Sequence, residues 1–153
     1  MVWANVRHFT REEWIKDPDK VHPDLVFLVD DYRGSLGSPV VILVAYDEGG
    51  HEPDSAHYAR PGEPWSMAVD CYAPKVPLVD QWLTAERFDF RGIGLYQWWR
   101  REIQPGVFER IPGLHLDIRS RLEHPTVGRR WTRDEQGVYQ PLDARFLRQI
   151  LAV

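Results

Sequence analysis

The sequence is poor in the features that stabilise very small proteins or anchor proteins in membranes. It contains a single cysteine, Cys71, so no disulfide can form within the chain and its stability must come from packing, with or without a metal ion. The longest uninterrupted apolar run, residues 40–46, is far shorter than the roughly 20 residues of a membrane-spanning helix. Residues 1–7 lack the charged leader and apolar segment of a secretory signal. We therefore expect cytoplasmic synthesis without a signal peptide and no membrane insertion.

An excess of positive charge is also lacking. The 153 residues include 19 Lys and Arg against 23 Asp and Glu, a net charge of −4. This balance argues against a protein that coats nucleic acid or an anionic membrane, so no nucleic-acid partner is expected. The chain is 43% hydrophobic and 12% aromatic, which is typical of a globular protein and not of a disordered one. Length and composition together predict one domain over residues 1–153.

Hydrophobic periodicity predicts an α+β fold. Thr10 and Glu13 have the spacing of a capping box at the start of a short helix. Apolar residues at three- and four-residue spacing predict longer helices, whereas β-branched or alternating runs predict strands. Helices are expected at 23–36, 77–88 and 142–151, strands at 40–46, 66–72, 92–96 and 113–119, a hairpin at 130–139, an exposed loop at 47–65 and an irregular stretch at 97–112. The predicted architecture is a small, mainly antiparallel sheet flanked by helices.

Three residues are candidates for a metal site: His57, Asp70 and His115. Two imidazoles and one carboxylate are a ligand set that a catalytic zinc uses while keeping its fourth position open. Asp117 shares a strand face with His115 and could orient its imidazole. Cys71 follows Asp70 and therefore points to the opposite face, which predicts a buried thiol and not a ligand. Because most histidines of such a chain lie at the surface, spacing alone leaves open that these are surface residues.

Five short motifs occur along the chain in a fixed order. They are Ser55-Ala-His57, Ala68-Val-Asp70, Gly92-Ile-Gly-Leu-Tyr96, His115-Leu-Asp117 and Gly128-Arg-Arg-Trp131. In this order, over about residues 10–133, the chain resembles the M15-type zinc peptidases, the group of D-alanyl-D-alanine carboxypeptidases and phage endolysins.

The resemblance implies that His57, Asp70 and His115 bind Zn²⁺. It also implies the α+β fold that these peptidases share with the hedgehog signalling domain. The implied substrates are the stem peptides of peptidoglycan, which contain D-amino acids. Zinc in such a site lowers the pKa of bound water toward about 7 and polarises the scissile carbonyl.

The sequence departs from the family pattern at three places. Twelve residues separate His57 from Asp70, where the family usually has six, which places an insertion at the rim of the site. Asp47 stands where the family has an arginine that holds the substrate or the oxyanion, and a carboxylate there would repel a substrate carboxylate. Pro112 and Gly113 stand where many relatives place the general base. The candidates that remain for the catalytic carboxylate are Glu109, Asp117 and Glu63.

Aromatic and basic residues near these motifs are candidates for holding the substrate. Aromatic rings stack on sugars and peptides, and guanidinium groups hold carboxylates through paired hydrogen bonds. Packing in the core is the alternative for the aromatic residues, and a solvated surface cluster is the alternative for the arginines. The candidates are Tyr46, Tyr96, Arg119, Arg130 and Trp131, with Trp65, Trp98 and Trp99 also close to the motifs in sequence.

The function predicted from the sequence is zinc-dependent hydrolysis of peptidoglycan stem peptides. Because no export signal is visible, a phage or prophage source is expected, with action on the cell wall after lysis or as part of a virion. The alternative, which Asp47 and Pro112 favour, is a catalytically silent component of a virion or tail that contacts other virion proteins. A third interpretation is a wall-binding module that uses tryptophan and arginine side chains without zinc.

Overall fold

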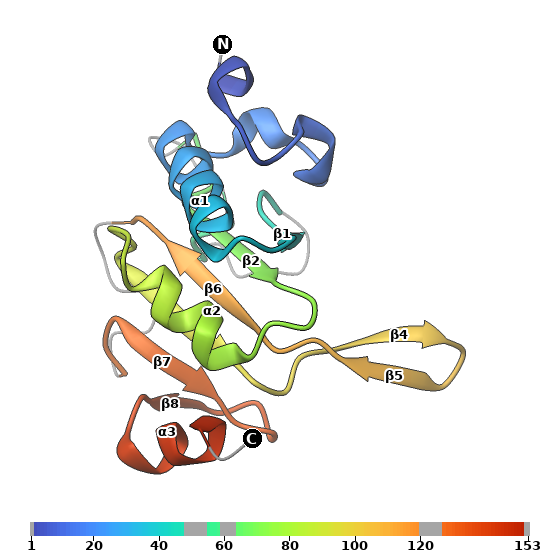
Figure 1. The fold of residues 1–153 in the computed structure, drawn as a ribbon, viewed down its shortest axis with the longest axis vertical. Coiled ribbons are helices and arrows are strands. Elements are labelled where there is room, and N and C mark those ends of the chain that lie inside the picture. The colour runs from blue at the N-terminus through green and yellow to red at the C-terminus, as the bar shows by residue number, and fades with distance from the viewer. Residues whose placement is uncertain (1, 48–54, 59–63, 120–126, 152–153) are drawn as a thin grey trace.

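Six strands form one sheet that runs through the middle of the protein (Figure 1). The computed structural model describes residues 2–47, 55–58, 64–119 and 127–151. The strands of this sheet are β1 (Val41–Val44), β2 (Ala68–Tyr72), β3 (Gly92–Tyr96), β6 (Gly113–Asp117), β7 (Arg130–Arg133) and β8 (Tyr139–Pro141). They lie in the order β1-β2-β6-β3-β7-β8, and every neighbouring pair is antiparallel except β3 and β7. The prediction of a mainly antiparallel sheet is confirmed.

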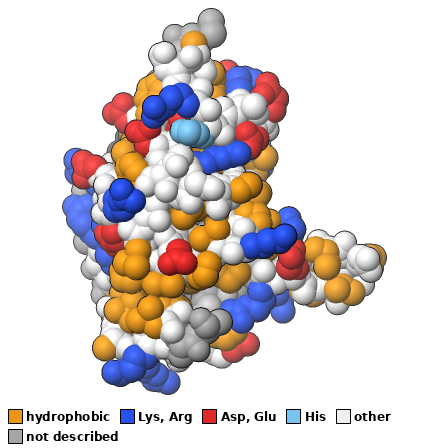
Figure 2. All heavy atoms as spheres, in the orientation of Figure 1, with side chains coloured by type: hydrophobic (Ala, Val, Ile, Leu, Met, Phe, Trp, Pro, Cys, Tyr) orange, Lys and Arg blue, Asp and Glu red, His pale blue; other side chains and the backbone are white. Residues whose placement is uncertain are grey.

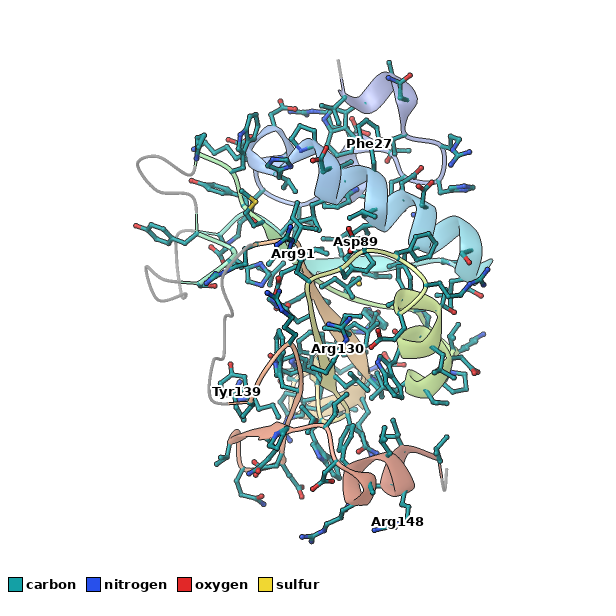
Figure 3. The ribbon with its side chains drawn as sticks, turned by 90° about the vertical axis from the view of Figure 1, so that its left-hand side faces the viewer. Phe27, Asp89, Arg91, Arg130, Tyr139 and Arg148 are labelled. Atoms are coloured by element: carbon teal, nitrogen blue, oxygen red, sulfur yellow. The ribbon has the colours of Figure 1, made fainter. Side chains whose placement is uncertain are left out.

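The described residues also form three α-helices beside the sheet. They are α1 (Pro23–Leu36), α2 (Leu78–Ala85) and α3 (Ala144–Leu151). Pro23 occupies the first position of α1, and Gly37, with φ of 66°, ends it in the left-handed conformation that glycine adopts most readily. Figure 3 shows α1 and α2 on the same side of the sheet. Among the described residues, no helix combines the length and hydrophobicity needed to span a bilayer. The predicted α+β class is confirmed.

Alternation along β6 gives the sheet two different faces. Leu114 and Leu116 are fully buried in the hydrophobic core that packs beneath the helices. His115 and Asp117 point the other way because successive side chains of a strand alternate. We call the side that carries His115 and Asp117 the polar face. Cys71 is free and buried on the core side, where burial raises the pKa of its thiol, so the prediction of a buried thiol is confirmed.

The prediction that residues 97–112 are irregular is wrong. β4 (Arg100–Gln104) and β5 (Val107–Arg110) form a two-stranded antiparallel arm that projects from the body (Figure 1). Every residue of both strands is exposed, so the apolar alternation that marks a half-buried strand is missing. Pro105 and Gly106 form the turn and are the local signal for a hairpin that the sequence contains. Figure 2 shows hydrophobic side chains on this arm.

The segment before α1 contains three 3-10 helices, at Val2–Asn5, Arg11–Glu13 and Pro18–Lys20. The predicted capping box is present, because the Glu13 carboxylate accepts a hydrogen bond from the backbone N–H of Thr10 at 2.7 Å. Asp30 of α1 is 2% exposed and accepts hydrogen bonds from three successive backbone N–H groups. These donors, at 2.9, 2.7 and 3.1 Å, are Arg7, His8 and Phe9. One buried carboxylate therefore fastens the N-terminal segment to α1.

We expect Asp30→Ala to lower the free energy of unfolding by at least about 2 kcal/mol, because hydrogen bonds to a charged acceptor contribute about 1.5–3 kcal/mol each. Asp31→Ala is the matched control. It removes only an exposed ion pair with Arg7, which contributes about 0–1 kcal/mol. Urea denaturation of both variants measures the difference, and equal losses would contradict the assignment.

Candidate metal centre

The structure brings the three predicted metal ligands together. Asp70 on β2 and His115 on β6 are direct cross-strand partners, so their side chains share the polar face. The rings of His57 and His115 lie with their centroids 5.2 Å apart. One ligand atom from each of the three residues lies within 4.8 Å of the other two. Both imidazoles are buried, at 2% and 3% exposure.

His57 reaches the polar face from residues 55–58, whose backbone is hydrogen-bonded to Asp47 and to Met67. Its carbonyl accepts a hydrogen bond from the N–H of Asp47 at 3.1 Å, and the carbonyl of Ala56 accepts one from Met67 at 2.8 Å. These bonds bury Ser55, Ala56 and His57. The prediction that residues 47–65 form an exposed loop is therefore wrong for this part.

The ring of His57 is oriented by a backbone carbonyl. Its Nδ1 lies 2.9 Å from the carbonyl oxygen of Ala45, which can only accept, so Nδ1 carries the proton and donates it. Ser66, which is fully buried, donates its hydroxyl to the same oxygen at 2.9 Å and holds this part of the backbone in place. Nε2 of His57 is consequently the nitrogen that faces Asp70.

The ring of His115 is oriented in the opposite sense by a carboxylate. Its Nε2 lies 3.1 Å from Oδ2 of Asp117, and its Nδ1 lies 2.9 Å from Oδ1 of Asp70. In a metal-bound form the Asp117 contact would keep the proton on Nε2 and leave Nδ1 to the metal. The Asp117 carboxylate has room beside His115 because its cross-strand partner on β3 is Gly92. A Cβ at Gly92 would overlap the Asp117 carboxylate. The first glycine of the Gly92-Ile-Gly-Leu-Tyr96 motif therefore makes room for the group that positions His115.

The two remaining imidazole nitrogens face the same carboxylate oxygen. Oδ1 of Asp70 lies 3.3 Å from Nε2 of His57 and 2.9 Å from Nδ1 of His115. Burial opposes ionisation of Asp70, but the two histidines outweigh it and hold the pKa of this carboxyl well below its usual range. Two imidazoles, each anchored through its outer nitrogen, and one ionised carboxylate fit the donor set of a metal site. The group could hold a metal ion.

An aromatic residue from β7 lies beside the cluster. Gly94 pairs with His115 on one side and with Trp131 on the other. Because Gly94 has no side chain, the indole of Trp131 occupies this space, with its ring centroid 5.2 Å from that of His115. Trp131 donates its indole N–H to the hydroxyl of Tyr96 at 3.2 Å. Two predicted substrate-binding residues, Trp131 and Tyr96, thus adjoin the cluster.

Two lysines from the N-terminal segment border the backbone that holds His57. Lys16 forms an ion pair with Asp47, the residue that replaces the expected family arginine. Lys20 donates to the hydroxyl of Tyr46 at 3.1 Å and lies 4.6 Å from the centroid of its ring. The negative charge of Asp47 is therefore offset by a neighbouring ammonium group.

The predicted arginines are divided between two places. Arg119 is buried directly beyond the end of β6. Arg130, labelled in Figure 3, is adjacent to Trp131 in β7 and so points to the opposite face. Its Nε lies 2.6 Å from Oε1 of Glu86 at the end of α2. The structure thus does not bring Arg130 to the cluster.

The predicted catalytic carboxylates are also separated. Asp117 contacts the cluster through His115. Glu109 lies on β5, where its carboxylate accepts a hydrogen bond from Arg101 at 3.0 Å, in the arm and outside the cluster. Glu63 lies outside the described residues.

Three contributors to the site were not found from the sequence. Ala45 acts through a backbone carbonyl, for which a side-chain pattern gives no signal. Ser66 is a buried hydroxyl next to a strand, and its polar character in an otherwise buried position is a weak signal. Lys16 is brought to Asp47 by a backbone with φ of 63°, and such a conformation is rare for a residue other than glycine.

Comparison of the chain with known proteins gives no match: no protein-family model, no curated protein and no solved structure matches it. The function is therefore inferred from the residues and geometry of this chain. The likeness to M15 peptidases stays an expectation from its motifs.

We expect Gly92→Ala to displace the Asp117 carboxylate and release the ring of His115. The variant should lose about 1–3 kcal/mol of stability through overpacking and bind an added divalent metal about 10–100-fold more weakly.

Gly34→Ala is the control, because the atoms nearest to its new methyl group belong to the ring of His8, an exposed side chain that can move aside. This change should leave metal binding intact and stabilise α1 by up to about 1 kcal/mol. Urea denaturation and metal titration measure both effects. Unchanged metal affinity in Gly92→Ala would show that Asp117 does not position His115.

Proposed function

We propose that the protein is a zinc-dependent peptidase of the M15 type with a hedgehog/DD-peptidase fold. Its substrates are the stem peptides of peptidoglycan, cleaved at bonds that involve D-amino acids. We further propose a phage or prophage source, with action on the wall after lysis or from the virion.

One observation carries the proposal: the two imidazoles are fixed in complementary orientations. His57 is anchored through Nδ1 and His115 through Nε2, so the nitrogen that remains on each ring faces Asp70. Both rings therefore direct their second nitrogen at one carboxylate, the arrangement in which a single ion could contact all three side chains. Histidine ligands of metals typically donate their other N–H to a carbonyl or carboxylate in this way.

Zinc is the metal that this donor set favours. Two nitrogens and one oxygen supply three ligands, which is the usual protein contribution to a catalytic zinc site with an open fourth position. Bound zinc supplies a Lewis acid and a means of activating water near neutral pH. Asp117 holds the ring of His115, and the carbonyl of Ala45 holds that of His57. Trp131 and Tyr96 are buried, at 1% and 7% exposure, and pack beside the ring of His115 as part of its support.

The ion pair of Asp47 with Lys16 also supports an active peptidase. An unpaired carboxylate beside the site would repel the carboxylate of a stem peptide. Lys16 offsets that charge, and Lys20 adds a second ammonium at Tyr46. The replacement of the expected arginine by Asp47 is therefore compatible with binding of an anionic substrate.

A catalytically silent virion or tail component is the second candidate. It is favoured by the placement of the carboxylates, because Glu109 lies on the arm and Asp117 is engaged with His115. In this alternative the cluster still binds a metal, which then contributes to stability and not to turnover.

We expect the purified protein to bind about one Zn²⁺ per chain, as three converging ligands predict. His57→Ala and His115→Ala should each weaken binding by at least about 100-fold, because losing a direct ligand costs more than losing a supporting group. Elemental analysis after dialysis and calorimetric titration measure stoichiometry and affinity.

His8→Ala removes an exposed histidine outside the cluster and should bind zinc like the original chain. A metal-free preparation that takes up no zinc, or equal affinity in all three variants, would rule out the site.

We expect the zinc-loaded protein to release new stem-peptide fragments from purified muropeptides, detected by mass spectrometry. His115→Ala should release none at equal concentration, since it removes a metal ligand. Absence of fragments from protein shown to contain zinc would reject the peptidase and favour the silent component.

A further inference from the structure

Two adjoining cavities open beside Trp98, at the turn that joins β7 to β8. Their volumes are about 270 and 360 Å³, comparable with the roughly 300–1,000 Å³ of small-molecule sites. Both are lined by Trp98 and by three turn residues, Asp134, Glu135 and Gln136. We call this pair of cavities the tryptophan cleft. It does not share a residue with the metal cluster.

The aromatic wall of the cleft is held in place by packing. Trp99 stacks on Tyr96 with ring centroids 4.3 Å apart and planes inclined by 16°. It lies against Gly113, where a Cβ would come within 3.1 Å of the Trp99 ring. Trp98 is 40% exposed, and the guanidinium of Arg110 lies 4.5 Å from its ring centroid. The cleft therefore presents a large, oriented aromatic surface that is not closed into the core.

The polar wall is a well-formed turn with free side chains at its tip. The carboxylate of Asp134 accepts a hydrogen bond from the N–H of Val138 at 2.8 Å, and its carbonyl accepts one from Gly137 at 3.0 Å. Glu135 and Gln136 are exposed, and within the described part of the chain their side chains form no hydrogen bond. A planar carboxylate and a planar amide are thus available to a ligand.

The charges around the cleft balance. The acidic residues Asp134, Glu135 and Asp143 are matched by the basic residues Arg133, Arg145 and Arg110, of which Arg110 lies on Trp98. A cleft with this balance gives no net attraction for an anion or a cation. It suits a neutral ligand with one flat apolar side and a rim of hydrogen-bonding groups.

The smaller cavity of the cleft is lined by Tyr96 and Arg133, which lie on the polar face, whereas the larger one extends toward α3. Tyr96 comes two residues after Gly94, the partner of His115, so it shares the face at a distance of about 7 Å along the strand. Tyr139, the partner of Arg133, lies on the side of the sheet away from α1 and α2 (Figure 3). The smaller cavity and the cluster therefore share one face of the sheet.

We infer that the tryptophan cleft binds a neutral sugar ring of the glycan strand that carries the stem peptide. A pyranose has an apolar C–H face that stacks on an aromatic ring, and hydroxyl groups that bond to carboxylates and amides. The inference rests on the proposed function, because the sugar in the cleft and the peptide at the cluster would belong to one polymer. Specificity for peptidoglycan would then come from both parts of the substrate.

Binding of chitotetraose, a soluble chain of N-acetylglucosamine, to the full chain tests the inference by calorimetry and tryptophan fluorescence. We expect saturable binding that Trp98→Ala and Glu135→Ala each weaken by about fivefold or more, the effect of losing one aromatic contact or one hydrogen bond. Both residues are exposed or at the surface of a turn, so both variants should fold. Phe108→Ala, which removes an exposed aromatic ring from the arm, should bind like the original chain.

The outcomes separate this inference from the proposed function. Binding that persists in His115→Ala supports a sugar site independent of the metal. The inference is overturned if the original chain does not bind chitotetraose, or if the two cleft variants bind it as tightly as the original chain does. It is also overturned if ethylamine, a small cation, displaces chitotetraose at the same concentration, because the cleft would then prefer a cation to a neutral sugar. Release of peptide fragments without sugar binding would leave the peptidase standing and reject the sugar site.

Discussion

The register of β2 against β6 is the constraint on which the candidate site depends. It sets Asp70 opposite His115, and the same pairing continues through Gly94 to Trp131 on β7. A slip of one residue would turn Asp70 or His115 into the hydrophobic core and destroy the cluster. The buried leucines on either side of His115 resist such a slip, because it would expose them. The packing of the core thus maintains the arrangement of the polar face.

The cluster is stable as a set of buried polar groups only because each member has a partner. An ionised carboxylate costs several kcal/mol to bury unless it is paired and hydrogen-bonded. Asp70 is paired with both imidazoles, and their outer nitrogens are bonded to Ala45 and Asp117. A metal ion would replace the direct contacts of Asp70 with His57 and His115. The surrounding hydrogen bonds would then hold the ligands in position for it.

Much of the fold could be predicted from the sequence, and both the correct and the wrong predictions have physical reasons. Alternation in residues 113–119 predicted the two faces of β6, because half-buried strands repeat every two residues. The same reasoning missed the arm, whose strands bury neither face. The three metal-ligand candidates came from residue types and motif order, and their convergence depended on tertiary structure that spacing does not encode. The roles of Ala45 and Lys16 could not be predicted from the sequence. Ala45 acts through its backbone carbonyl, and Lys16 reaches Asp47 from a bend in the segment before α1.

X-ray absorption at the zinc edge of the zinc-loaded protein tests the central claim most directly. A site built from His57, Asp70 and His115 predicts two imidazole nitrogens at about 2.0–2.1 Å, together with oxygen ligands and a coordination number near four. Replacing either histidine should remove about half of the imidazole scattering, because each supplies one of the two nitrogen ligands. A shell of about six oxygen atoms without imidazole would place the metal elsewhere. It would contradict the assignment of this cluster as a metal centre.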